Sequence, residues 1–101
     1  MTDRKSPSGP LSALEGTITF DAASCGAAAV TVQTLTIAGA LPGDIALLAP
    51  PAAGLSVAVN IGIGYVSAAN TVKVPFTNPT AGALDPASAV YSYTLLRPNL
   101  P

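Results

Sequence analysis

The sequence predicts an all-β protein: a small antiparallel β-sandwich or barrel of about six to seven strands, preceded by an extended N-terminal arm. Apolar residues recur at every second position through much of the chain, which is the period of half-buried strands. Pro or Gly interrupts every window long enough to hold a helix, and no stretch keeps a helical period. Turn residues separate the apolar segments at intervals of about 8–12 residues, as is typical of such folds.

Residues 1–15 are expected to form the arm, and residues 16–101 a single β-domain. The first ten residues combine Ser, Pro, Gly and charged side chains without apolar periodicity, so they cannot bury enough surface to fold alone. Leu11 and Leu14 are candidates to anchor the end of the arm. The arm is either a disordered tail or a strap that orders on a neighbouring protein, and the sequence leaves both open.

The period of two begins at Gly16. Segment 17–20 is the first predicted strand, with Ile18 and Phe20 on one face. Segment 29–37 is the second, and its apolar side chains change parity in mid-strand, from Val30 and Val32 to Leu35 and Ile37. Because one extra residue swaps the buried face of a strand, this change predicts a bulge near Gln33 and Thr34.

The next two predicted strands lie on either side of a proline pair. Segment 44–48 is a short strand with Ile45 and Leu47 facing inward, and Pro50 and Pro51 end it. Segment 55–63 alternates strictly and is the clearest strand signal in the chain. Gly62 and Gly64 take the opposite parity, where a missing side chain allows another group to approach closely.

The last third of the chain reads as a turn at 67–70, a strand, a loop at 78–88 and a final strand. Strand 71–77 points Val72, Val74 and Phe76 inward, and final strand 90–96 does the same with Tyr91, Tyr93 and Leu95. Pro75 cannot donate to a ladder, so its strand is expected to lie at a sheet edge or to bulge there. Asp85, followed by Pro86, is expected to cap one short helical turn.

Charge is scarce. Charged residues make up 9% of the chain, against roughly 25% in an average soluble domain. Beyond Gly16 the charged residues are only Asp21, Asp44, Lys73, Asp85 and Arg97. A small free monomer normally keeps a charged surface of mixed sign. Either Thr, Ser and Asn make this surface polar enough, or a permanent oligomer or larger shell covers much of it.

The composition argues against two kinds of partner. The net charge is −1 and the body beyond Gly16 holds only two basic residues, too few for a run of phosphate contacts, so nucleic acid is not expected. Arg4 and Lys5 are too small a pair to form a basic arm. The longest apolar run, 45–55, is broken by Pro and Gly and falls short of the roughly 20 residues of a spanning helix. A membrane is therefore not expected either.

The residues offer little catalytic chemistry, and we expect no enzyme, no metal and no cofactor. The chain has no His, which excludes an imidazole base and a Ser-His-Asp triad. Cys25 is the single cysteine, so an internal disulfide is excluded. Asp21, Asp44 and Asp85 are isolated in sequence, each beside a turn, where Asp most often caps the turn. Their convergence on a divalent cation or in a carboxylate pair stays open, although nothing in their spacing suggests it.

The best candidate contact residues lie near the C-terminus. Tyr91, Tyr93 and Arg97 are of the types enriched at interface hot spots, because they bury area and keep a polar group. The alternative is that the tyrosines complete the core. The full candidate interface adds arm residues to these three: Arg4, Lys5, Leu11 and Leu14.

The run YVSAANTVKVPFTNPTAGALDPASAVYSYTLLRP resembles small β-domains of structural proteins from tailed bacteriophages. The pattern is a VSAANTV turn, an FTN-x-TAGA-x-DPAS strand and loop, and a closing aromatic-rich strand. The matching residues are Val66 to Val72, Val74, Phe76 to Asn78, Thr80 to Ala83 and Asp85 to Ser88. The upstream half is similar to the first half of the same domain, so the resemblance covers about Gly16 to Arg97.

The resemblance implies a structural role in a virion, without catalysis. Such domains occur alone as capsid decoration (cement) proteins and as parts of head or tail fibres. A chain of 101 residues with a short arm favours a decoration protein, expected as a homotrimer bound to the major capsid protein on the capsid surface. The rival is a receptor- or carbohydrate-binding fibre module. That module should expose aromatic residues in its loops, and loops 38–44, 67–70 and 78–88 contain none.

Overall fold

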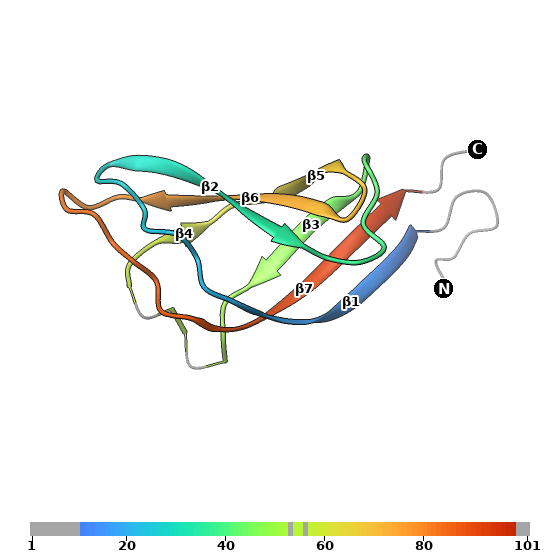
Figure 1. Cartoon of the computed structure of the whole chain (residues 1–101), viewed down its shortest axis with the longest axis horizontal. Helices are drawn as coiled ribbons and strands as arrows, with labels where there is room; N and C mark the ends of the chain where they lie inside the picture. Colours follow the sequence, from blue (N-terminus) through green and yellow to red (C-terminus); the bar gives the residue numbers. More distant parts are fainter. Residues whose placement is uncertain (1–10, 53, 56, 99–101) are drawn as a thin grey trace.

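The computed structural model describes residues 11–98 except 53 and 56 (Figure 1). This part of the chain contains seven strands and no helix, so no helix in it is long and apolar enough to cross a membrane. The strands are β1 (Leu11–Phe20), β2 (Ala29–Thr36), β3 (Ile45–Ala49), β4 (Asn60–Ile61), β5 (Gly64–Ala68), β6 (Thr71–Asn78) and β7 (Ala89–Pro98).

All strand pairs are antiparallel, which confirms the predicted fold class. The strands follow the order β1-β7-β3-β5-β6-β2, and β4 pairs with β6 beside β5. The sheet folds over, so that β2, β6 and β5 form one layer and β1, β7 and β3 the other (Figure 1). β1 and β2 are the two edges, and the sheet stays open between them.

Three aromatic rings join the two layers. Phe20 of β1 meets Phe76 of β6 edge-on with ring centroids 6.5 Å apart, and Tyr91 of β7 at 5.8 Å. Such edge-to-face contacts are the favoured geometry for aromatic pairs. The rest of the core is aliphatic and comes from every side of the fold: Leu35, Ile37, Ala46, Leu48, Val59, Val66, Val72, Val74 and Leu95.

β1 begins at Leu11, so the predicted arm is shorter than 1–15. Its first residues pair with the end of β7, from Leu11 opposite Pro98 to Glu15 opposite Thr94. The prediction placed the boundary where apolar alternation starts, but backbone pairing with β7 needs no such alternation. Residues 1–10, with the candidates Arg4 and Lys5, lie outside the described residues.

The predicted bulge in the second strand is absent. β2 pairs with β6 in one unbroken register, from Ala29 opposite Asn78 to Thr36 opposite Thr71. The buried face of β2 contains Gln33 and Leu35, and Val30 and Val32 point outward, 59% and 49% exposed. The prediction of a bulge from the parity change was wrong because polar Gln33 occupies the core face and the two valines lie at the surface. A register irregularity does occur elsewhere, between Val66 and Ala68 of β5.

β3 is turned the opposite way from the prediction. Ala46 and Leu48 are buried, and the larger Ile45 and Leu47 are about 40% exposed. Close contact with Gly64 explains part of this orientation. A Cβ added to Gly64 would lie only 3.1 Å from the Ala46 methyl, so little space remains beside Ala46. The small side chain faces a crowded part of the core, which leaves the bulky neighbours outside.

The clearest strand signal, 55–63, forms only the two-residue strand β4. Before it, the N–H of Val59 donates to the C=O of Val57 over 3.0 Å, a tight local bond that no strand makes. Val59 is nonetheless buried, and Leu55, Val57 and Ile61 pack against the core. The alternation correctly predicted the core side of 55–61, because a segment that covers the core alternates as well as a paired strand does. It was wrong at Ile63, which is 69% exposed.

Pro75 lies inside the sheet, contrary to the predicted edge position. β6 has β2 on one side and β5 and β4 on the other. The C=O of Pro75 accepts the N–H of Gly62 over 2.8 Å. Because the N–H and C=O of a strand residue point the same way, the missing N–H faces the short gap between β4 and β5.

The two glycines around this gap are required by close contacts, as predicted. A Cβ on Gly62 would lie 3.0 Å from Pro75 Cγ. A Cβ on Gly64 would lie 2.7 Å from the carbonyl oxygen of Lys73, closer than real Cβ contacts come. The helical turn expected after Asp85 is absent: residues 85–88 are irregular.

Candidate interaction surfaces

Tyr91, predicted as a contact residue, is a core residue. Its side chain is fully buried (0% exposed) among the aromatic rings described above. Burial raises the pKa of its phenol, and the hydroxyl has no hydrogen-bond partner within the described chain. Its assignment to an interface is therefore corrected, and the alternative, completion of the core, holds for this tyrosine.

Tyr93 is half-buried and covers a glycine of the neighbouring strand. Gly16 stands opposite it in the β1–β7 register, and a Cβ on Gly16 would lie 2.7 Å from the Tyr93 hydroxyl oxygen. The ring thus rests on the bare backbone of β1. This contact accounts for Tyr93 within the chain itself.

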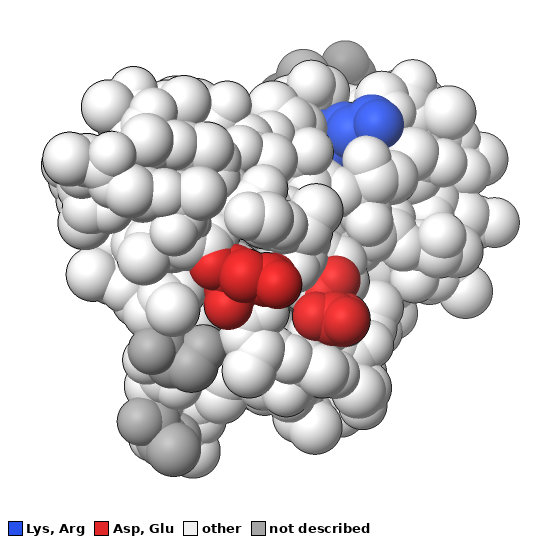
Figure 2. Space-filling view, turned by 60° about the vertical axis from the view of Figure 1, so that its left-hand side comes forward, with Lys and Arg blue, Asp and Glu red and all other residues white. Residues whose placement is uncertain are grey.

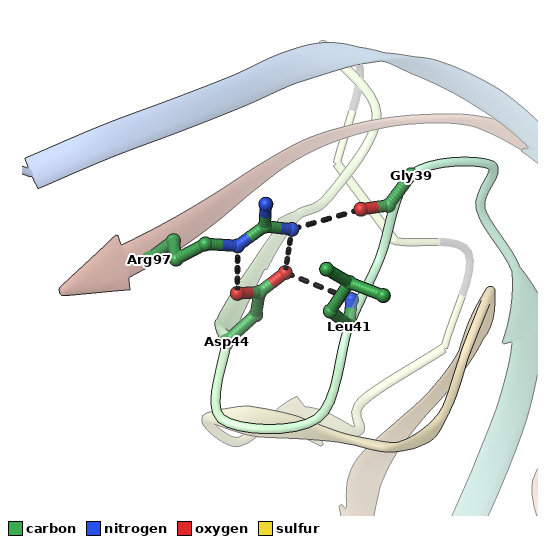
Figure 3. A network of polar contacts seen from close by, with 4 residues as sticks. All are labelled: Gly39, Leu41, Asp44 and Arg97. Atoms are coloured by element: carbon green, nitrogen blue, oxygen red, sulfur yellow. Dashed lines mark hydrogen bonds and ion pairs between the residues drawn. The ribbon is translucent and has the colours of Figure 1, made fainter. Parts of the chain in front are cut away.

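Arg97 forms an ion pair that the sequence did not indicate (Figure 3). Its Nε donates to Asp44 Oδ1 over 2.7 Å and its Nη2 donates to Oδ2 over 2.8 Å, while Nη2 also reaches the Gly39 carbonyl at 2.9 Å. The Asp44 side chain is 1% exposed and that of Arg97 is 42% exposed. The two residues are 53 positions apart, and only the adjacency of β3 and β7 brings them together.

Asp44 also closes its own turn. Its Oδ2 accepts the N–H of Leu41 over 3.0 Å, the Asx-type bond expected of an aspartate at a turn. The hydrogen bonds from Arg97 hold the pKa of this carboxyl below its ordinary value, and burial opposes them without prevailing. The same pair raises the pKa of the Arg97 guanidinium. The pair therefore fastens the 39–44 turn to the end of β7.

A hollow of about 230 Å³ lies against this ion pair, lined by Ala13, Leu14, Gly39, Asp44, Leu95 and Arg97. It brings together two of the predicted residues, Leu14 and Arg97, at the end of the molecule where β1 starts and β7 ends. Leu11 stands nearby, opposite Pro98. The Nη1 of Arg97 makes no hydrogen bond to the described residues, so a partner that covers the hollow can receive one.

Neutral amides hold the opposite end of the molecule. Gln33 donates from Nε2 to the C=O of Ala23 over 3.0 Å and accepts the Ala23 N–H at Oε1 over 2.9 Å. The buried amide therefore bonds both backbone groups of Ala23 in segment 21–25, as the backbone of a neighbouring strand would. Cys25 is fully buried beside it, its Sγ 3.7 Å from Nε2.

Asn78 binds the 78–84 loop to the same segment. Its Nδ2 donates to the carbonyls of Cys25 and Gly82 at 3.1 and 2.8 Å, and its Oδ1 accepts the N–H and hydroxyl of Thr80 at 2.8 and 2.7 Å. A two-way backbone bridge between Cys25 and Leu84 closes the arrangement. Sequence reasoning missed Gln33 and Asn78 because polar residues in strands are expected to face solvent.

The outer face of the sheet is rich in exposed apolar side chains. Ile45 pairs with Leu96 on one side and with Tyr65 on the other, and Tyr65 is 53% exposed. Val32 stands opposite Pro75 farther along the same face. We call this set the outer apolar face: Val30, Val32, Ile45, Leu47, Tyr65, Pro75 and Leu96. The sequence placed four of these side chains in the core, so this face was not foreseen.

Charged side chains are sparse over the same molecule. Figure 2 shows a small acidic cluster and a separate basic group on an otherwise uncharged surface. Lys73, which borders the outer apolar face, donates from Nζ to Thr34 Oγ1 over 2.8 Å. Within residues 11–98 as described, no group of three or more His, Cys, Asp or Glu side chains gathers where it could hold a metal ion.

Comparison of the chain with protein-family models, curated proteins and solved structures gives no match. The resemblance to phage structural domains thus rests on the sequence motifs alone.

Proposed function

We propose that this protein is a structural protein of a bacteriophage virion, a capsid decoration protein that binds the head surface and stabilises it through protein–protein contacts. The observation that carries the proposal is the outer apolar face. Groups of exposed apolar side chains on a protein surface mark sites where another protein docks. Few charges border this face, so little desolvation of ions opposes its burial.

The motif residues of the resemblance have structural tasks in this fold. Asn70 adopts a positive φ of 64° at the β5–β6 turn, and its Oδ1 accepts the N–H of Gly39 over 2.9 Å. Asn78 and Thr80 organise the loop that follows β6. A motif that specifies turns and a loop is consistent with a structural domain, and it supplies no residue for catalysis.

A homotrimer bound to the major capsid protein completes the proposal. Leu14 and Arg97, beside the hollow, and the outer apolar face are the surfaces it offers to these partners. Arg97 suits a polar contact at the rim, because its Nη1 is free of bonds to the described residues. The Asp44 pair fixes the guanidinium in place before a partner arrives, which lowers the entropic cost of the contact.

One observation favours a second candidate, a carbohydrate- or receptor-binding module of a fibre. Tyr65 is an exposed aromatic ring on a strand, flanked by Ile45 and by Lys73. Sugars stack on such rings, and an adjacent amine can bond a hydroxyl. The loops, where such modules usually carry their aromatics, contribute none.

The deciding experiment is to separate virions into heads and tails and to measure this chain in each fraction by quantitative mass spectrometry. A decoration protein is expected in heads at a fixed ratio to the major capsid protein. Presence in tails alone supports the fibre candidate. Absence from both fractions contradicts the proposal.

A reconstitution assay then tests the surface. Heads stripped of the chain should rebind the wild-type protein and the Thr17→Ser control, and bind the Leu47→Lys variant at least ten-fold more weakly. Thr17 and Leu47 are both exposed and outward-facing, but only Leu47 belongs to the outer apolar face. Equal binding of all three proteins would remove this face from the proposal.

A further inference from the structure

Strand β2 has one bonded side and one free side. Val32 stands opposite Pro75 in the β2–β6 register. Pro75 has no N–H, and its C=O is directed to Gly62 on the far side of β6. Val32 and Pro75 therefore exchange no hydrogen bond, and the N–H and C=O of Val32 point away from β6.

The backbone N–H and C=O groups point away from β6 at every second residue along β2. Val30, Thr34 and Thr36 share the parity of Val32, and all four residues are exposed. Among residues 11–98 as described, no hydrogen bond outside the strand ladders involves their backbone groups. Along its outer side, β2 thus presents a row of unused N–H and C=O groups, in the geometry that accepts a further strand.

Nothing in β2 protects this edge. Natural sheets blunt their edges with charged residues, prolines, bulges or very short strands. The eight residues of β2, AVTVQTLT, contain no charge and no proline, and their register shows no bulge. The other edge strand, β1, carries Glu15 on its exposed side.

We propose that the free edge of β2 pairs with β2 of a second copy of this chain, antiparallel about a two-fold axis at Val32. In this register Val32 faces Val32 of the second copy, and Val30 faces its Thr34. Pairs of β-branched residues stabilise neighbouring strands. The row Pro75–Val32 then continues across the axis into the same row of the second copy, which extends the outer apolar face without interruption.

The charges are compatible with this contact. Lys73 lies beside Thr34, which would face Val30 of the second copy, so the two lysines fall on opposite sides of the axis and do not meet. The first ten residues of the chain are a poorer occupant of the edge. They contain Pro7, Gly9 and Pro10, which are disfavoured in strands.

This contact goes beyond the proposed virion role and does not depend on it. A two-fold contact of one strand with itself closes at two copies. A homotrimer needs two different surfaces, so its contacts lie elsewhere on the molecule. Pairing of every β2 edge therefore at least doubles the mass of whatever assembly those other surfaces form.

Cysteine cross-linking tests the register. In the proposed pair the two copies of residue 32 have Cα atoms about 5.5 Å apart, within disulfide range. The two copies of residue 30 are offset by roughly 13 Å along the strands. Under mild oxidation the Val32→Cys protein should run as a covalent dimer on a non-reducing gel, and the Val30→Cys protein should not. A mixture of Val30→Cys and Thr34→Cys should cross-link to each other.

The native Cys25 is fully buried, so the wild-type chain serves as the background control. Cross-linking of Val30→Cys as readily as Val32→Cys would overturn the register. Absence of cross-linking in all three preparations would overturn the contact itself. Neither result bears on whether the chain is found in phage heads.

A proline variant tests the hydrogen bonds. The N–H of Val32 is not used by β6, so Val32→Pro removes an edge donor and leaves the internal ladder intact. Light scattering should show an assembly mass reduced at least two-fold for Val32→Pro and an unchanged mass for Val32→Thr, which keeps the N–H. A folded Val32→Pro protein with the wild-type mass would contradict the proposal, and the cross-linking result decides the matter if that variant does not fold.

Discussion

At the end of the molecule where β1 starts and β7 ends, a carboxylate and a guanidinium fasten a turn to a strand. Segment 21–25 and the 78–84 loop lie at the opposite end (Figure 1). There two neutral amides have the equivalent role: Gln33 binds segment 21–25, and Asn78 binds the 78–84 loop. Both arrangements satisfy buried polar groups with several hydrogen bonds each. They differ in whether a charge, and hence a proton equilibrium, is involved.

The difference shows how a domain with so few charges closes its loops. Amides do not titrate, and their hydrogen bonds are not screened by salt, so the amide end should hold over a wide range of solution conditions. The ionic end gains charge-assisted bonds, which are about twice as strong as neutral ones. It also becomes dependent on pH, because one partner is a carboxylate.

The largest expected effect comes from the amide end. The side chain of Asn78 is fully buried, and Asn78→Ala removes four hydrogen bonds. The carbonyls of Cys25 and Gly82 each lose one of their two donors, and the N–H and hydroxyl of Thr80 lose their acceptor. We expect the free energy of unfolding in urea to fall by about 3 kcal/mol. Asn78→Asp is the matched variant, since it keeps the acceptor for Thr80 and loses the donor. A loss under half of that value for Asn78→Ala would show that the loop is held chiefly by the Cys25–Leu84 bridge.

Gln33→Met should destabilise the fold by about 2 kcal/mol, because it keeps the shape of the side chain and removes both bonds to Ala23. Hydrogen exchange locates the effect: protection of the Ala23 amide should drop while that of β7 amides is retained. Uniform loss of protection would indicate that Gln33 stabilises the whole core and not one segment.

The ionic end should show itself in the pH dependence. In the folded state the pKa of Asp44 lies below its ordinary value of 3.8, so the unfolded chain takes up the proton first as the pH falls. The stability that the pair contributes is complete well above that value and is lost as the pH drops below it. Asp44→Asn should cost about 2 kcal/mol at neutral pH and flatten the acid limb of the stability profile.

The pH profile of Asp44→Asn needs reference proteins. The wild-type and Asn78→Ala proteins provide the references, because each retains the Asp44 pair and neither adds a carboxylate. An acid limb as steep in Asp44→Asn as in the wild-type protein would assign the pH dependence to another carboxylate.

The smallest expected effect lies between the two ends, at the Tyr91 hydroxyl. This oxygen has no partner among the described residues, unlike the buried side-chain polar atoms at either end. Tyr91→Phe removes the unsatisfied group and should raise the free energy of unfolding by about 1 kcal/mol. A decrease measured by urea unfolding would show that the hydroxyl is in fact bonded in solution.

The sequence predicted the fold class and the faces of the last two strands because Val72, Val74, Phe76, Tyr91 and Leu95 alternate with polar or small residues. It failed in β2 and β3, where alternation exists on both parities. There the choice of face depends on tertiary contacts: Gln33 with Ala23 on one strand, Ala46 against Gly64 on the other.

The contact surfaces could be predicted less well than the fold. Leu14 and Arg97 were named and do lie together, but Asp44 was missed because its partner is distant in sequence. The outer apolar face was hidden for a related reason. Exposed valines, isoleucine and leucine have the same pattern as buried ones until the opposite face of each strand is known.

The pairing of Leu11 with Pro98 gives the molecule a polarity. The described chain enters and leaves at one pole, and the amide-bound loops form the other. A protein genetically joined directly before Leu11 or directly after Pro98 would lie at this pole, so both fusions should leave the loop pole and the free edge of β2 unobstructed. The β1–β7 pair thus fixes which end of the domain faces a fused protein and which end stays exposed.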